Sequence, residues 1–193
     1  VSGLQEQLAA GVRSTAADGL DQVEQLRAIR ARVEDLVARQ ARVFTKEVVP
    51  ALQEAGVEFA DWGDLSPDDQ AQLTRVFEDR IFPVLTPLAV DPAHPFPYIS
   101  NLSLNLAVAV RDPNTGEQRF ARVKVPPLLP RFVALPGNTR FVALEQVIAA
   151  HLDALFPGME VLARYPFRVT RDADFELADE GERIALVAPF GDA

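Results

Sequence analysis

A proline-rich segment near the middle of the chain constrains the fold more than any other feature. Five prolines fall within the fifteen positions from Pro83 to Pro97. Each proline fixes φ and removes a backbone donor, so this stretch cannot form a helix or a central strand. After it, apolar residues alternate with small or polar ones from Leu102 to Arg111, which is the period of a strand with one buried face. The sequence therefore predicts an extended connector at residues 81–100 that leads into the first strand of a sheet.

A long helix is predicted ahead of this connector. Asp21 and Glu24 have the spacing of a capping box, and apolar residues then recur with a helical period as far as Leu52. Pro50 is expected either to kink this helix or to start its last turn. Gly56 is expected to end it.

A short strand at residues 57–60 and a second helix are predicted next. Ser66 and Pro67 have the types expected at the N-cap and the first position of that helix, which we expect to stop before the proline at position 83. Asp68 and Asp69 follow, where negative charge stabilises the positive end of the helix dipole. We prefer this explanation of the two carboxylates to acid–base chemistry or magnesium binding.

Strands dominate after the connector. Turn residues at positions 112–116 predict a hairpin into a strand at 118–125. The pentapeptide RFVAL occurs at positions 131–135 and again at 140–144, with Pro-Gly-Asn-Thr between the two copies. This pattern predicts a second hairpin.

A helix at residues 145–156 and a last strand at 160–170 complete the pattern. Helices first and strands later predict an α+β fold, in which long N-terminal amphipathic helices precede an antiparallel sheet with a backing helix. The expected organisation is a helical segment at 1–80, the connector at 81–100, an α+β domain at 101–177 and a divergent, flexible tail at 178–193.

The composition excludes several classes of function. The formal net charge is −9, so the long-range field repels nucleic acid and other polyanions, and we expect no nucleic-acid partner. The chain has no cysteine, which removes disulfides and thiolate chemistry and fits a reducing cytoplasm. No apolar run approaches the ~20 residues needed to span a bilayer. We therefore expect a cytoplasmic protein without a transmembrane segment.

The residues that could carry chemistry are few. No glycine-rich phosphate loop and no spaced metal-binding motif occurs, and the two histidines, His94 and His151, have no arginine cluster near them in the sequence. For His94 we predict a structural hydrogen bond, with contact to a partner or ligand as the alternative. For His151 we predict a surface or boundary position on a helix. Asp172 and Asp174 are assigned to a turn or domain boundary, so the sequence predicts no catalytic, cofactor-binding or metal-binding residue.

Two groups of basic residues remain. On the long helix, five arginines are interspersed with acidic residues, including Asp35 four positions before Arg39, which predicts a solvated, ion-paired face. On the strand at 118–125, Arg122 and Lys124 share one parity and are expected to project from one side of the sheet. Arg122 and Lys124 are therefore candidate anion contacts.

Residues 81–106, IFPVLTPLAVDPAHPFPYISNLSLNL, closely resemble a segment of the bacterial polyphosphate kinases of the first class. In that family the segment joins an N-terminal helical domain to the head domain. Other family-like motifs follow the family's order: LVARQARVF at 36–44, ARVKVP at 121–126, RFVALP at 131–136 and FRVTRDADFE at 167–176. The resemblance covers roughly residues 1–177, and the tail departs from it.

The resemblance implies an enzyme that reversibly transfers the terminal phosphate of ATP to polyphosphate through a phosphohistidine, with Mg²⁺. The family places the nucleophile, its arginines and the magnesium site in two C-terminal domains, and an ATP-contacting asparagine ahead of residue 1. We therefore expect a fragment that forms a structural, dimerising part of the enzyme and is inactive alone. Its expected partners are a second copy, through the head domain, and the remaining domains; polyphosphate binds only in the full enzyme.

Two other interpretations stay open. The first is a free-standing binding or regulatory module with the head-domain fold, which a reading frame continuing into a catalytic domain would exclude. The second is an independent small enzyme, which is disfavoured because no nucleophile and base converge in the sequence.

Overall fold

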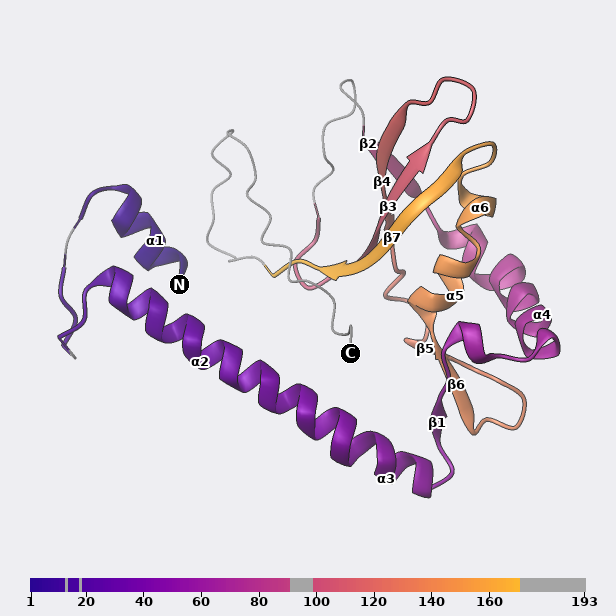
Figure 1. The fold of residues 1–193 in the computed structure, drawn as a ribbon, viewed down its shortest axis with the longest axis horizontal. Helices are drawn as coiled ribbons and strands as arrows, with labels where there is room; N and C mark the ends of the chain where they lie inside the picture. Colours follow the sequence, from indigo (N-terminus) through magenta and orange to yellow (C-terminus); the bar gives the residue numbers. More distant parts are fainter. Residues whose placement is uncertain (13, 18, 91–98, 171–193) are drawn as a thin grey trace. The chain divides into compact units, whose positions relative to one another are not determined.

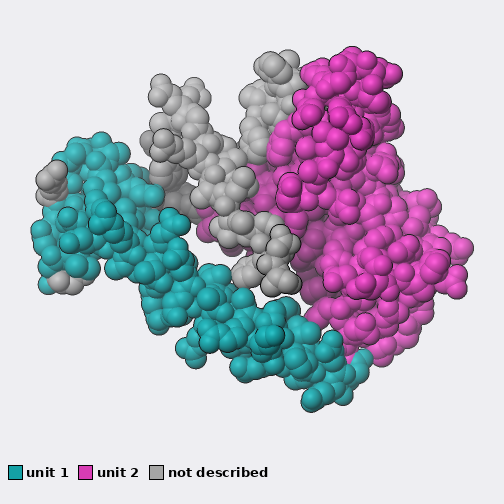
Figure 2. Space-filling view, viewed as in Figure 1, with its two compact units in different colours: residues 1–56 teal, residues 57–193 magenta. Residues whose placement is uncertain are grey.

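The computed structural model describes residues 1–12, 14–17, 19–90 and 99–170. The chain divides into two compact units, residues 1–56 and residues 57–193 (Figure 2). The predicted helical segment at 1–80 is therefore shared between the two units. The predicted tail at 178–193 lies outside the described residues.

The first unit is helical (Figure 1), with α1 (Ser2–Ala9), α2 (Gln22–Val43) and α3 (Val49–Glu54). The predicted capping box at the start of α2 is confirmed: Asp21 Oδ1 accepts from the Glu24 amide at 2.9 Å, and the Asp21 amide donates to Glu24 Oε2 at 2.9 Å. Gln22, which is only 2% exposed, donates from Nε2 to the Val12 carbonyl at 3.1 Å and to Ser14 Oγ at 2.9 Å. These bonds hold the turn between α1 and α2.

The end of the long helix follows from proline and glycine chemistry. A π-helical turn at Phe44–Val48 separates α2 from α3, and Pro50 lies in the first turn of α3. Proline has no amide hydrogen, so it interrupts the regular series of helical backbone hydrogen bonds at this point. Gly56 has a φ of +80° just after α3, as expected for a residue that ends a helix.

The second unit contains a four-stranded antiparallel sheet. Its order is β2 (Pro87–Val90), β4 (Gln118–Lys124), β3 (Leu104–Arg111) and β7 (Glu160–Arg168). The predicted alternation is confirmed on the face that packs against the core, where the side chains are at most 3% exposed; these are Leu106, Val108, Val110, Ala121 and Val123. The helices α5 (Leu144–Ala150) and α6 (Leu152–Leu155) contact β3 and β7, respectively (Figure 1). The predicted α+β fold is confirmed.

The two outer strands of this sheet both contain proline. Pro87 is the first residue of β2, so part of the predicted connector forms an edge strand. Pro166 lies within β7 and is paired with Leu106 of β3. A proline is compatible with an edge strand because the missing amide can face away from the neighbouring strand.

The hairpin formed by the two RFVAL copies belongs to a second, three-stranded sheet. β5 (Phe132–Ala134) and β6 (Arg140–Ala143) pair antiparallel, as predicted, and β1 (Glu58–Phe59) joins β6 in parallel. The turn contains Gly137 and Asn138, with φ of +90° and +55°. Glycine and asparagine are the residues that best tolerate these values, so the turn chemistry explains the hairpin.

The predicted helices of the second unit are present with different ends. α4 (Pro67–Val76) begins as predicted, with Ser66 Oγ accepting from the Asp69 amide at 3.2 Å. Helical turns then continue through Phe77–Ile81 and Phe82–Val84, so the expected stop before the proline at position 83 is wrong. The helix predicted at 145–156 is broken into α5 and α6 at His151, whose φ is −120°.

Candidate functional site: a cationic pocket at one end of the four-stranded sheet

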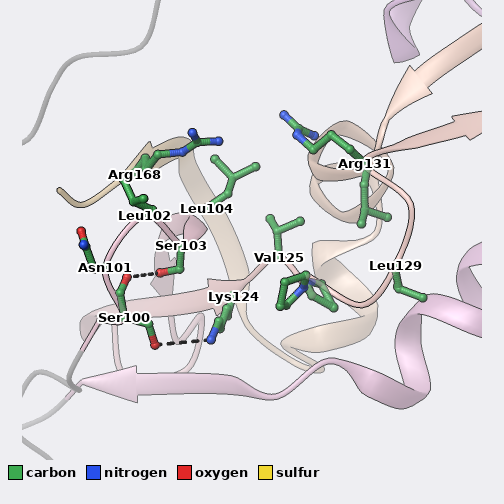
Figure 3. Close-up of a pocket in the computed structure, with 13 residues that line it drawn as sticks. Ser100, Asn101, Leu102, Ser103, Leu104, Lys124, Val125, Leu129, Arg131 and Arg168 are labelled. Carbon is green, nitrogen blue, oxygen red and sulfur yellow. Dashed lines mark hydrogen bonds between the residues drawn. The ribbon is translucent and has the colours of Figure 1, made fainter.

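A pocket of about 410 Å³ lies at the end of the four-stranded sheet where β4 and β7 terminate (Figure 3). Its wall consists of residues 100–104, residues 124–127 and four further side chains: Leu129, Arg131, Leu144 and Arg168. The wall therefore combines leucine, valine and proline side chains with three basic ones. This combination of apolar surface and a few polar groups is typical of small-molecule sites.

Strand pairing brings two of the basic residues to the pocket. Lys124 and Arg168 are the last residues of β4 and β7, and both strands pair with the start of β3. Arg168 is opposite Leu104, and the Val125 amide donates to the Leu104 carbonyl at 2.9 Å. Lys124 and Arg168 are far apart in the sequence but meet at the same end of the sheet.

Arg131 reaches the pocket from the loop before β5. Its carbonyl accepts from the Leu144 amide at 3.0 Å, which fixes Arg131 beside the start of α5. There both terminal guanidinium nitrogens of Arg131 donate to the carboxylate of Glu145. The guanidinium also lies 5.5 Å from the ring centroid of Phe132. Arg131 is thus held by a charged pair and an aromatic ring.

The guanidinium groups of Arg131 and Arg168 are near enough for the charge of Arg168 to act on Arg131. Burial, reinforced by the charge of Arg168, lowers the pKa of the Arg131 guanidinium. In Figure 3 the two guanidinium groups extend toward one another from opposite walls. Like charges that face each other repel, so this end of the pocket favours an anion between them.

Lys124 lies at the other end of the pocket. Its Nζ is 3.5 Å from Ser100 Oγ, and the turn after Ser100 is closed by a bond from Ser103 Oγ to the Ser100 carbonyl at 2.7 Å (Figure 3). A ligand at this end would therefore meet an ammonium group and a hydroxyl group.

Leu102 forms part of the wall in a strained conformation. Its φ is +59°, although the residue is not glycine, and its side chain is 59% exposed. Its amide donates to the Val169 carbonyl at 2.8 Å, which helps to hold the turn in place. A left-handed leucine is uncommon, and strained backbone of this kind clusters at functional sites.

Lys124 and Arg122, the two anion contacts predicted from the sequence, lie in different environments in the structure. Lys124 lines the pocket, whereas Arg122 lies between Leu88 and Ala107 on neighbouring strands and is only 7% exposed. Burial lowers the pKa of the Arg122 guanidinium. Arg131 and Arg168 were not predicted, because nothing in the sequence shows that they meet Lys124.

His151 occupies the boundary position that was predicted for it. Its ring nitrogens bond to the Val147 carbonyl at 2.8 Å and to Thr74 Oγ1 at 3.0 Å. The ring stacks on Phe77 and meets Trp62 edge-on. These contacts give His151 a structural role in the described part of the unit.

Of the remaining residues considered in the sequence analysis, Asp69 is described by the structure and three others are not. Asp69 accepts from Arg140 at 3.0 Å, in addition to its place in the first turn of α4. His94, Asp172 and Asp174 lie outside the described residues. Within the described ranges, no group of three or more histidine, aspartate or glutamate side chains is placed to hold a metal ion.

On α2 the predicted ion-paired face is present with other partners. Arg30 pairs with Glu34 at 2.9 Å, and Asp35 pairs with Arg32 at 2.8 Å, where a pair with Arg39 was predicted. These side chains are largely exposed, so each pair contributes little stability. Among the described residues, no helix is both long and apolar enough to cross a membrane.

The family models and the known proteins that match this sequence are all polyphosphate kinases. Residues 1–60 match the family model of the polyphosphate kinase N-terminal domain, and residues 68–189 match that of the polyphosphate kinase middle domain. The chain is 56% identical to a polyphosphate kinase of Streptomyces coelicolor and 47% identical to one of Thermosynechococcus vestitus, over 97% of its own length in both cases. It spans only 25% and 27% of those relatives.

A solved structure agrees with these matches. The crystal structure of the polyphosphate kinase from Porphyromonas gingivalis superposes with a TM-score of 0.67 at 35% sequence identity. The similarity covers 75% of this chain and 25% of that chain.

Proposed function

The chain belongs to the polyphosphate kinase family, and we propose that it serves as a structural part of such an enzyme and does not transfer phosphate by itself. In the full cytoplasmic enzyme, the proposed activity is reversible transfer of the terminal phosphate of ATP to polyphosphate through a phosphohistidine, with Mg²⁺. This chain spans about a quarter of the length of the relatives it matches.

The environment of His151 supports the proposal that this residue is not the phosphate-accepting nucleophile. A histidine that accepts a phosphoryl group needs an accessible ring nitrogen and cations beside the transferred phosphate. Both ring nitrogens of His151 are engaged, by Val147 and Thr74, and its ring packs on Phe77. This arrangement supports a structural role for His151.

The test is a phosphate-transfer assay on the 193-residue chain. With radiolabelled ATP, Mg²⁺ and polyphosphate, we expect no label in polyphosphate and no acid-labile label on the protein, while a full-length homologue is active in parallel. Robust transfer by the chain alone would overturn the proposal. If transfer is seen, His151→Gln decides whether that residue is the acceptor.

We also propose that the second unit contributes to dimerisation. Several large apolar side chains remain exposed on it, with Leu128 at 96% and Tyr165 at 59%. Exposed apolar side chains of this kind are common where subunits associate. Sedimentation velocity on the chain should detect a dimer, and Leu128→Asp should weaken it if that loop lies in the interface. A chain that stays monomeric at high concentration would contradict dimerisation through this unit.

The second candidate function is a free-standing binding or regulatory module with the same fold. The cationic pocket favours it, because a purely structural part needs no such site. Sequencing the gene on both sides of this segment separates the two proposals. A frame that continues into catalytic domains supports the enzyme part, and flanking stop and start codons support the module.

A further inference from the structure

We propose that the pocket at the end of β3, β4 and β7 binds an organic phosphate. Its phosphate group lies between Arg168 and Arg131, its apolar body lies on the leucine and proline wall, and an acceptor at its far end reaches Lys124. Nothing in the proposed phosphate transfer requires this site, so it stands whether or not the chain is active alone.

The charges of the pocket favour an anion. Arg131 is compensated by Glu145, whereas Lys124 and Arg168 form no ion pair with a carboxylate anywhere in the described part of the chain. Positive charge therefore remains at both ends of the pocket, on a chain whose net charge is −9. Basic side chains that are gathered in a concave site on an acidic protein attract anions locally.

The two guanidinium groups define the position of the phosphate. Arg131 and Arg168 extend toward each other in Figure 3, and the charge of Arg168 acts on Arg131. An oxyanion between them would accept hydrogen bonds from Arg168, whose guanidinium has no ion pair among the described residues. Both terminal nitrogens of Arg131 already donate to Glu145, so Arg131 would contribute mainly through its charge. Guanidinium groups match phosphate oxygens in planar, two-point contacts, which a lysine cannot make.

The remaining wall explains why the ligand should be organic. Leu102, Leu104, Val125 and Leu129 line the space together with two prolines. An inorganic phosphate chain would leave this surface in contact with water, whereas an apolar or aromatic body would cover it. The volume of about 410 Å³ lies in the range of roughly 300–1,000 Å³ typical of small-molecule pockets.

The turn that carries Leu102 gives independent support. Its left-handed backbone exposes an apolar side chain at the pocket, where a glycine would relieve the strain. Retaining a leucine in this conformation is understandable if its side chain contacts a ligand.

The experiment is an NMR titration of the ¹⁵N-labelled chain with adenosine 5′-monophosphate. Adenosine and inorganic phosphate serve as the two halves of the probe, and inorganic triphosphate serves as a purely polar polyanion. We expect saturable shifts at the amides of Leu102, Lys124 and Arg168, with each half binding more weakly than the whole. Higher salt should weaken the binding.

Four variants sharpen the test. Arg168→Gln should weaken binding about tenfold, because it removes a charge-assisted hydrogen bond, and Lys124→Gln should weaken it to a smaller extent. Arg75→Gln, which removes an exposed arginine of α4 that lies outside the pocket, should leave the affinity unchanged. Glu145→Gln should tighten binding, because Arg131 then loses its compensating carboxylate. Unperturbed spectra outside the site would show that each variant is folded.

Three results would overturn the inference. The first is the absence of shifts at the pocket amides up to millimolar probe. The second is an affinity for inorganic triphosphate equal to that for adenosine 5′-monophosphate, which would show that the apolar wall does not contribute to binding. The third is an equal effect of Arg75→Gln and Arg168→Gln, which would show that the affinity depends only on the net charge of the chain. Each of these results is independent of the phosphate-transfer assay.

Discussion

The ring of His151 stacks on the ring of Phe77, with centroids 4.3 Å apart and an angle of 13° between the planes. His151 also hydrogen-bonds to the Val147 carbonyl and to Thr74 Oγ1, and Thr74 Oγ1 is 2.8 Å from the Gln70 carbonyl. Since a carbonyl can only accept, the Nδ1 atom of His151 carries a hydrogen. His151, the residue after α5, is therefore hydrogen-bonded to Val147 of α5 and Thr74 of α4, and it stacks on Phe77, the residue after α4.

Replacing His151 should destabilise the second unit. His151→Phe retains an aromatic ring but loses both hydrogen bonds, and we expect a loss of about 1–3 kcal/mol in the free energy of unfolding. Unfolding in urea measures this loss of stability. Thr74→Val acts on the same network, so the double variant should cost less than the sum of the single changes. Strictly additive losses would contradict a shared network.

Removing the capping box should weaken the long helix. Asp21→Ala deprives the Glu24 amide of its acceptor, and the expected loss is about 1 kcal/mol. Thermal unfolding followed by circular dichroism, together with hydrogen exchange at the Glu24 amide, measures the change. Asp35→Ala, which removes only an exposed ion pair in the middle of α2, is the control and should cost about 0.5 kcal/mol or less. Equal effects of the two variants would show that the cap has no special role.

Leu102→Gly should stabilise the chain. Glycine adopts the φ of +59° without strain, and the relief should exceed its greater entropy in the unfolded state by about 0.5–1 kcal/mol. Leu128→Gly is the matched control, because Leu128 is also exposed but has no left-handed backbone; this change should be destabilising. If Leu102→Gly lowers the urea midpoint, the leucine side chain supports the fold by contacts that outweigh its strain.

The turn at Asp112 should make the first hairpin sensitive to pH. A hydrogen bond from the Asn114 amide lowers the pKa of the Asp112 carboxyl from its ordinary value of 3.8. Because the folded-state pKa lies below the unfolded value, the ionised carboxylate stabilises the hairpin above the unfolded value. That contribution is lost as the pH falls through the folded pKa.

Asp112→Ala should therefore destabilise the hairpin at neutral pH and have little effect in acid below the folded pKa. Urea midpoints of the variant and the unaltered chain at several pH values measure this difference. Asp64→Ala removes the same charge from an exposed position and is the control. A difference between Asp112→Ala and the unaltered chain that is constant with pH would contradict the role of the ionised carboxylate.

Features set by neighbouring residues could be predicted from the sequence. The Asp21 and Ser66 caps each act on an amide three residues away, and the turn at Gly137 and Asn138 joins two strands that are adjacent in the chain. The residue types alone specify such contacts, because each requires only one local backbone conformation. These elements were predicted close to their observed positions.

Features that depend on distant pairing could not be predicted. The parallel pairing of β1 with β6 places Arg140 opposite Glu58, and these two strands form with β5 a sheet separate from the four-stranded one. The pocket requires the ends of β4 and β7 to meet and the loop with Arg131 to bend toward them. Only the register of the sheet determines these neighbours, and residue types at short range carry no information about it.

The prolines at positions 87 and 166 have a consequence for assembly. Each lies on an outer strand of the four-stranded sheet, where it leaves a gap in the row of amide donors that another β-strand would need. Within the part of the chain that the structure describes, the sheet is thus poorly suited to grow by adding a strand from a second molecule. Copies of this chain that associate should therefore do so through side chains, and the unpaired strand edges offer little template for fibril formation.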